Sequence, residues 1–156
     1  MHRQLDNVVI VDSIYRITLD SVTINDENGQ QTWTYIVEEL ENSMDISNWA
    51  LEICEDATVV SSTEGAEVGP PGGGEGNCLN GENCSLEYDV LKQIKWAVDD
   101  DFTIGTFEFT LDRCYPMGEV YVAIKTGGTD QCFCSRIQGP VCGNCPPIPG
   151  RGILFI

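Results

Sequence analysis

Hydrophobic and polar residues alternate with a period of two along most of the chain. Within residues 32–39, Trp33, Tyr35 and Val37 fall on one face and polar side chains separate them. A period of two is typical of strands with one face in a core. Short strands with frequent turn signals favour two packed sheets. The predicted fold class is therefore all-β, an antiparallel β-sandwich or jelly roll. The same alternation recurs in residues 14–24, 48–54, 107–112 and 120–125.

One segment predicts a turn, and another fits either a helix or a strand. Asn28-Gly29 lies between two alternating segments, which predicts a hairpin turn. Residues 88–98 fit a helix with Ile94 and Val98 on one side, or a strand carrying Ile94 and Trp96. We favour a strand over residues 93–97.

The pattern divides the chain into one domain with two extensions. We expect the β-sandwich to span residues 14–145, with an N-terminal extension over residues 1–13. Residues 61–84 are rich in Gly, Glu, Pro and Asn and are predicted to be an insertion without regular structure. Residues 146–156 are a stiff Pro-rich linker followed by an apolar run.

Both extensions carry a continuous apolar run of four residues. Such runs are expected for strands that are covered on both faces. They can be edge strands of their own sandwich, or connector strands that one subunit donates to the sheet of the next. We expect the second arrangement, so the predicted subunit contacts are Val8, Val9, Ile10, Val11, Ile153, Leu154, Phe155 and Ile156.

The charge is strongly acidic. The 156 residues include 25 acidic and 8 basic side chains, a formal net charge of −17. Such a surface repels phosphate backbones and anionic membranes, so we expect no nucleic-acid and no membrane partner. Calcium is the alternative use of this charge, at residues 25–29 or 99–101, but neither segment has the spacing of a calcium loop.

Eight cysteines in a chain of this length favour disulfides and an oxidising location. Cys132 and Cys134 point to the same side of a strand, so each is expected to bond elsewhere, in its own chain or in a neighbouring subunit. We expect Cys78 and Cys84 to tie the base of the insertion together. Zinc held by the last four cysteines is the alternative. The predicted disulfide cysteines are Cys54, Cys78, Cys84, Cys114, Cys132, Cys134, Cys142 and Cys145.

Catalytic constellations are scarce in the sequence. The single histidine, His2, leaves no Ser-His-Asp or Cys-His arrangement, and no glycine-rich segment has the context of a phosphate loop. We therefore expect no enzyme, no catalytic residue, no resident metal and no cofactor. Trp33, Trp49 and Trp96 are predicted core anchors, with sugar-stacking platforms as the alternative.

Four stretches carry a family resemblance. They are residues 33–37 (WTYIV), 46–54 (ISNWALEIC), 107–112 with 115–125 (FEFTLD and YPMGEVYVAIK), and 137–142 (IQGPVC). These resemble a family of Gram-positive bacterial surface proteins over about residues 14–142. The resemblance implies a β-sandwich at the cell or spore surface and supplies no functional residue. Endospore appendage subunits, which are jelly rolls cross-linked by disulfides, are similar in concept, although their motifs do not match closely.

These observations predict a structural subunit of an extracellular fibre or surface layer, on a bacterial cell or spore. We expect head-to-tail homo-oligomers joined by strand donation and disulfides, with other surface proteins as further partners. An adhesin or carbohydrate-binding module that uses exposed aromatic residues is the alternative, and a small metal-binding electron carrier is a third interpretation.

Overall fold

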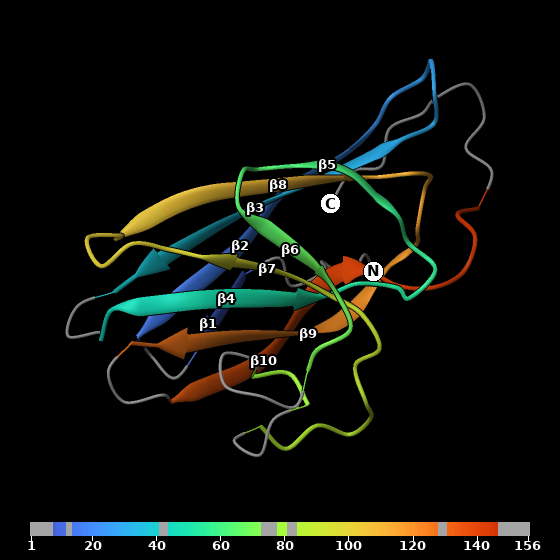
Figure 1. Ribbon diagram of the computed structural model, residues 1–156. Coiled ribbons are helices and arrows are strands. Elements are labelled where there is room, and N and C mark those ends of the chain that lie inside the picture. The colour runs from blue at the N-terminus through green and yellow to red at the C-terminus, as the bar shows by residue number, and fades with distance from the viewer. Residues whose placement is uncertain are drawn as a thin grey trace, which may run out of the picture.

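The computed structural model describes residues 8–11, 14–40, 44–72, 78–80, 84–127 and 131–146. Two five-stranded antiparallel sheets pack face to face, in the orders β1-β2-β3-β8-β5 and β10-β9-β4-β7-β6 (Figure 1). The described residues contain no helix, and therefore none long and apolar enough to cross a membrane. The strands are β1 (Val8–Val11), β2 (Tyr15–Ile24), β3 (Gln31–Glu39), β4 (Ile46–Glu52), β5 (Val59–Ser62), β6 (Ala66–Gly69), β7 (Gln93–Ala97), β8 (Ile104–Leu111), β9 (Met117–Thr126) and β10 (Cys132–Pro140).

The predicted fold class is confirmed as an all-β arrangement of two sheets with four disulfides. The predicted strand over residues 93–97 is β7. The strand order is that of a sandwich but does not establish the connectivity of a jelly roll.

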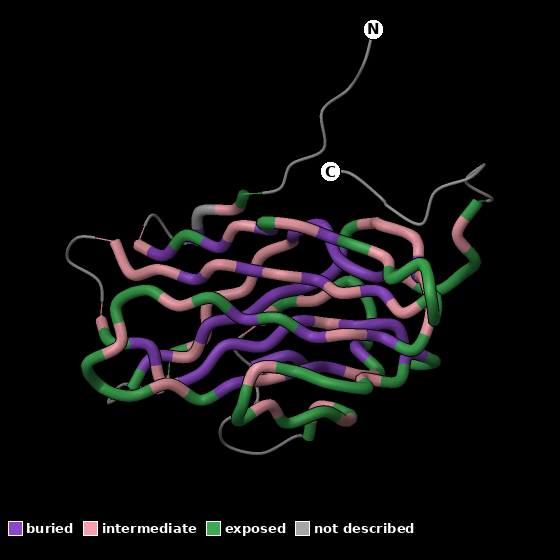
Figure 2. The backbone as a smooth tube through the Cα atoms, turned by 90° about the horizontal axis from the view of Figure 1, so that it is seen from above, coloured by how far each residue is buried: buried purple, intermediate pink, exposed green. Residues whose placement is uncertain are grey.

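The core lies between the two sheets and is filled by the alternating side chains. Buried and more exposed positions alternate along the backbone (Figure 2). In β3, Trp33, Tyr35 and Val37 are fully buried, and the residues between them are partly exposed. Trp49 of β4 and Trp96 of β7 stack inside this core with their ring centroids 5.1 Å apart. All three tryptophans are therefore core anchors, as predicted, and their burial rules them out as sugar-stacking platforms.

The β2–β3 connection is the predicted hairpin. Gly29 has a positive φ of 74°, a conformation that residues with a Cβ rarely adopt. The Asn25 side chain accepts a hydrogen bond from the Glu27 amide at 2.8 Å, and Asn28 accepts one from Gln30 at 2.9 Å. These asparagine oxygens hold the turn together, which accounts for the polar cluster without calcium.

The prediction that residues 61–84 lack regular structure is wrong for their first part. The last two residues of β5 and the whole of β6 lie within this segment. β5 pairs with β8 in one sheet and β6 pairs with β7 in the other, so the chain crosses between the sheets at Gly65. The pairing partners lie between 24 residues (Gly69 and Gln93) and 52 residues (Val59 and Leu111) away in the sequence, which is why local composition did not reveal these strands.

The N-terminal apolar run forms an edge strand of its own sheet. Val8–Val11 pairs with residues 15–18 of β2 in the antiparallel sense, and β1 lies next to β10 of the opposite sheet. The exposed fraction of Val8 is 47%, whereas Val11 is buried. The C-terminal run, Ile153–Ile156, lies outside the described residues.

Candidate assembly surface and binding groove

All eight predicted cysteines are bonded within the chain, and none is free. The expectation that some disulfides cross between subunits is therefore not met, because every thiol already has an intrachain partner. The zinc alternative is also wrong, because the last four cysteines belong to four different disulfides. The pairs are Cys54–Cys142, Cys78–Cys132, Cys84–Cys134 and Cys114–Cys145.

Two of these disulfides attach a covering segment to the outside of the second sheet. Cys132 and Cys134 stand on the same side of β10 and bond Cys78 and Cys84, so the prediction that they do not bond each other is confirmed. The prediction that Cys78 and Cys84 tie the base of the insertion together is wrong, because both cysteines bond to β10. The two sulfurs on one face of an edge strand thus act as two anchor points.

The covering segment, defined as residues 78–80 and 84–92, buries a second apolar cluster on the outer face of β4 and β9. Asn80 holds the two parts of the segment together, since its side chain donates to the Val90 carbonyl at 2.6 Å and accepts from the Val90 amide at 2.9 Å. The cluster consists of Ala50, Cys78, Leu79, Val90, Tyr121 and Ala123. This part of the outer face of β4 and β9 is therefore shielded from solvent, although the alternating pattern predicted that it would be solvent-exposed.

A polar network fixes the other side of the covering segment. The Tyr121 hydroxyl accepts hydrogen bonds from the Glu87 amide at 2.8 Å and from Arg136 at 2.9 Å. Arg136 also forms an ion pair with Glu87 at 2.8 Å, and this hydrogen bond raises the pKa of the guanidinium further. Tyr88 donates to Glu52 at 2.7 Å, and burial together with this bond raises the pKa of Tyr88.

An acidic groove of roughly 240 Å³ opens beside this network, where β4 and β10 end and β9 begins. Carboxylates of Glu52, Glu55, Asp89 and Glu119 line it. Tyr88, with an exposed fraction of 45%, forms part of its wall. Carboxylates and an exposed aromatic ring can together hold a polyhydroxylated or a cationic ligand.

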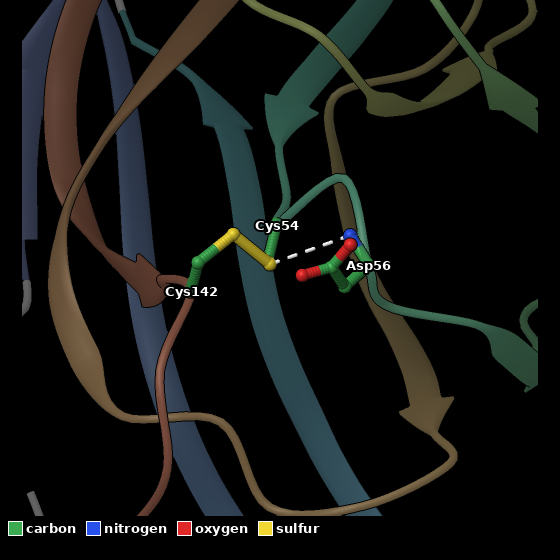
Figure 3. Close-up of side chains that lie close together, drawn as sticks. All are labelled: Cys54, Asp56 and Cys142. Atoms are coloured by element: carbon green, nitrogen blue, oxygen red, sulfur yellow. Dashed lines mark hydrogen bonds between the residues drawn. A yellow bond between two sulfur atoms is a disulfide. The ribbon is translucent and has the colours of Figure 1, made fainter.

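The Cys54–Cys142 disulfide lines the same groove. Asp56 lies next to the disulfide, with its amide donating to the Cys54 sulfur at 3.4 Å (Figure 3). The ligand atoms of the three residues lie within 4.8 Å of one another. This is the one group among the described residues with three metal-ligating side chains in such proximity. In the oxidised protein the two sulfurs are bonded to each other and are not thiolate ligands.

The candidate assembly surface is the outer edge of β2. β2 has ten residues and β1 has four, and β1 covers only residues 15–18. Among the described residues, no strand pairs with this edge over residues 19–24. Leu19 and Val22 on this stretch are buried, so the edge borders the core. Of the predicted contact residues, Val8, Val9 and Val11 lie beside this edge, whereas Ile10 has a described backbone only.

Sequence reasoning missed the covering segment and its groove. One signal was present, because Val120 to Ile124 is an unbroken apolar run in a strand that was predicted to have one wet face. A continuous run is typical of a strand covered on both faces. No sequence signal placed Tyr88, Arg136 and Glu52 together.

A scan against protein-family models, a search of curated proteins and a search of solved structures each find no match.

Proposed function

We propose that this chain is a structural subunit of a self-assembling extracellular fibre or surface layer. In the proposed assembly, residues 153–156 of one copy pair with the open edge of β2 in the next copy. The observation that carries the proposal is the six-residue stretch of β2, residues 19–24, that β1 leaves uncovered.

Among the described residues, no strand pairs with the N–H and C=O groups of this stretch, which lies at the rim of a buried core. Proteins usually cover or blunt such edges, because a second strand can pair with them. Leu19 and Val22 face the core from this edge with exposed fractions of 2% and 3%. An added strand would therefore form main-chain hydrogen bonds with β2 and pack its side chains at the rim of the core.

The proposed donor is the C-terminal apolar run, because the N-terminal run has a partner in its own chain. Val8–Val11 already pairs with its own β2. Ile153–Ile156 has no polar side chain, and burying four large apolar side chains is worth roughly 6–12 kcal/mol. The ten residues from 147 to 156 can span about 33 Å when extended, which is enough to reach an adjacent copy.

The point where the chain leaves the described residues lies near the acceptor edge. Cys145 is bonded to Cys114, and the neighbouring Tyr115 exchanges two hydrogen bonds with Gln31. Gln31 in turn pairs with Ile24, the last residue of β2. The last described part of the chain, at Cys145, is therefore linked through these contacts to the end of β2, and we propose that the residues after it act as the donor. Exchange that does not close on itself grows a filament.

The disulfides suit a subunit that works outside the cytosol. Each of the four bridges is expected to stabilise the fold by roughly 2–4 kcal/mol, and such bridges persist in oxidising environments. Since all eight cysteines pair within the chain, the proposed assembly relies on strand donation without disulfides between subunits. A cell or spore surface is the proposed location.

Sedimentation velocity of the full chain and of two variants tests this function. Phe155→Asp places a charge in the proposed donor strand, and deletion of residues 150–156 removes it. Both are expected to abolish multimers, because a buried unpaired charge opposes strand insertion. Arg3→Gln serves as the matched control at the other end of the chain. Normal multimers from both altered proteins contradict strand donation.

A carbohydrate-binding module is the second candidate, and the acidic groove favours it. Tyr88 offers a ring for stacking, and Glu55 and Asp89 offer acceptors for sugar hydroxyls. Binding to a glycan array that is lost in Tyr88→Ala and retained in Tyr88→Phe supports this function. An array with no signal above background argues against it.

A further inference from the structure

We propose that the reduced form of this chain holds a zinc-type divalent metal ion between the Cys54 and Cys142 thiolates and the Asp56 carboxylate, and that formation of the Cys54–Cys142 disulfide expels the ion. The proposal does not depend on the assembly function. It concerns the state of the chain before this disulfide forms.

The positions of the ligand atoms fit a metal site once the disulfide is open. The sulfurs and the carboxylate oxygen lie within 4.8 Å of one another. Zinc with metal–sulfur bonds of about 2.3 Å in a tetrahedral arrangement places its two sulfurs about 3.8 Å apart. The sulfurs therefore need only separate from bonding distance, and water can fill the fourth position.

The backbone around Cys54 holds these ligands in place. The Ala57 amide donates to the Cys54 carbonyl at 3.0 Å, which closes a turn that brings Asp56 beside the sulfur. The Tyr115 hydroxyl donates to the Asp56 carbonyl at 3.2 Å. The Asp56 amide already points at the Cys54 sulfur at 3.4 Å, and such a donor stabilises a thiolate as well as a disulfide sulfur.

Exposure and charge single out this disulfide from the other three. Cys142 is the only exposed residue among the eight cysteines, whereas Cys54 is buried, so a dithiol reductant has access to this bond from the Cys142 side. Glu52 and Glu55 line the same groove and add negative charge, which disfavours metal-free thiolates and favours a divalent cation. A metal ion therefore compensates the charge that would otherwise keep these thiols protonated.

A dithiol reductant gives two electrons and two protons to the Cys54–Cys142 disulfide and becomes a cyclic disulfide, leaving two thiols. The metal ion displaces both thiol protons when it binds. A disulfide-type oxidant later removes two electrons, reforms the sulfur–sulfur bond and releases the ion. Among eight cysteines with 105 possible pairings, a shared metal ion would keep Cys54 and Cys142 together until they are oxidised.

Limited reduction of the full chain with a dithiol, followed by addition of Co²⁺ or Cd²⁺, tests the proposal. Alkylation mapping should show Cys54 and Cys142 reduced first. One ion should bind per chain with thiolate-to-metal charge-transfer absorption, and mild reoxidation should release it to a chelator. The Cys54→Ser/Cys142→Ser variant should lack this absorption, whereas the matched Cys78→Ser/Cys132→Ser variant should keep it.

Asp56→Asn provides a variant that keeps all eight cysteines. It should weaken metal binding at least about tenfold while leaving the oxidised fold unchanged. Unchanged affinity in Asp56→Asn, absence of stoichiometric metal after reduction, or earlier opening of the other disulfides each overturns the proposal.

Discussion

The Tyr35 hydroxyl donates a 2.8 Å hydrogen bond to the Gln138 carbonyl, and this buried bond joins the two sheets. Tyr35 belongs to β3 and Gln138 belongs to β10, 103 residues further along the chain. Gly139 permits the approach, because a Cβ there would lie 2.5 Å from a Val120 methyl and 3.2 Å from the Tyr35 hydroxyl. The polar link is therefore built into otherwise apolar packing.

Replacing Tyr35 by Phe should lower the free energy of unfolding by about 1–3 kcal/mol. The ring still fills its place, but the buried Gln138 carbonyl loses its donor. Urea denaturation at neutral pH measures the effect. Thr23→Val, on the exposed side of β2, is the control and should change stability little. Equal stability of Tyr35→Phe and the native protein would contradict the role given to this bond.

Alkaline pH should lower the free energy of unfolding because the Tyr35 hydroxyl ionises less readily in the folded state than in the unfolded state. Burial raises the pKa of Tyr35 well above its usual value near 10. Below pH 10 the hydroxyl is protonated in both states, so the stability is fully present. Above pH 10 the unfolded state loses this proton first, and stability should fall by about 1.4 kcal/mol per pH unit until the folded pKa is reached.

Denaturation midpoints between pH 9 and pH 11.5 measure this slope. Tyr35→Phe should flatten it. Burial and the hydrogen bond to Asp112 raise the pKa of Tyr115 to about 12, so Tyr115→Phe should remove a similar contribution between pH 10 and pH 12. The same pH dependence in Tyr35→Phe and the native protein would show that Tyr35 ionises equally easily in both states.

The two stacked tryptophans should respond differently to the same substitution. The Trp96 indole donates to the Thr63 carbonyl at 3.1 Å, whereas the Trp49 indole nitrogen has no hydrogen-bond partner in the part of the chain that the structure describes. Both lose a similar apolar area as Phe, so Trp96→Phe should cost about 1 kcal/mol more than Trp49→Phe. Thermal or urea denaturation of both variants decides the order. A larger cost at Trp49 would contradict the assigned hydrogen bonding.

Removing the Cys84–Cys134 disulfide should free the covering segment while the two-sheet core persists. The segment buries Tyr121 and Ala123 from outside the sheet and does not reach the core between the sheets. Limited proteolysis of Cys84→Ser/Cys134→Ser should therefore give early cleavage near residues 84–92, with near-ultraviolet circular dichroism of the core tryptophans retained. The native protein is the control. Global unfolding instead of local cleavage would show that the segment is part of the cooperative core.

The alternating strands could be predicted from sequence, and the covering segment could not. A strict period of two separates Trp33, Tyr35 and Val37. Because successive side chains of a strand point to opposite faces, these three residues share one face, which is buried. β5 and β6 are short and partly exposed, and their existence depends on partners β8 and β7 far along the chain. Long-range pairing of this kind leaves no local period.

The candidate site likewise has one part that could be predicted from the sequence and one part that could not. The i, i+2 spacing of Cys132 and Cys134 excluded a bond between them, because strand geometry decides which way they point. Their partners, Cys78 and Cys84, depend on how the insertion folds back, and nothing in the spacing encodes this. The groove beside Cys54 likewise combines residues from four separated segments.

Electron microscopy of the purified full chain at rising concentration tests the central claim most directly. The account predicts filaments or ordered layers whose formation stops when a peptide with the sequence of residues 150–156 is added in excess, because the peptide occupies the open edge of β2. A scrambled peptide of the same composition should have no effect. Particles that remain single sandwiches at every concentration, or closed dimers without further growth, would contradict the proposed assembly.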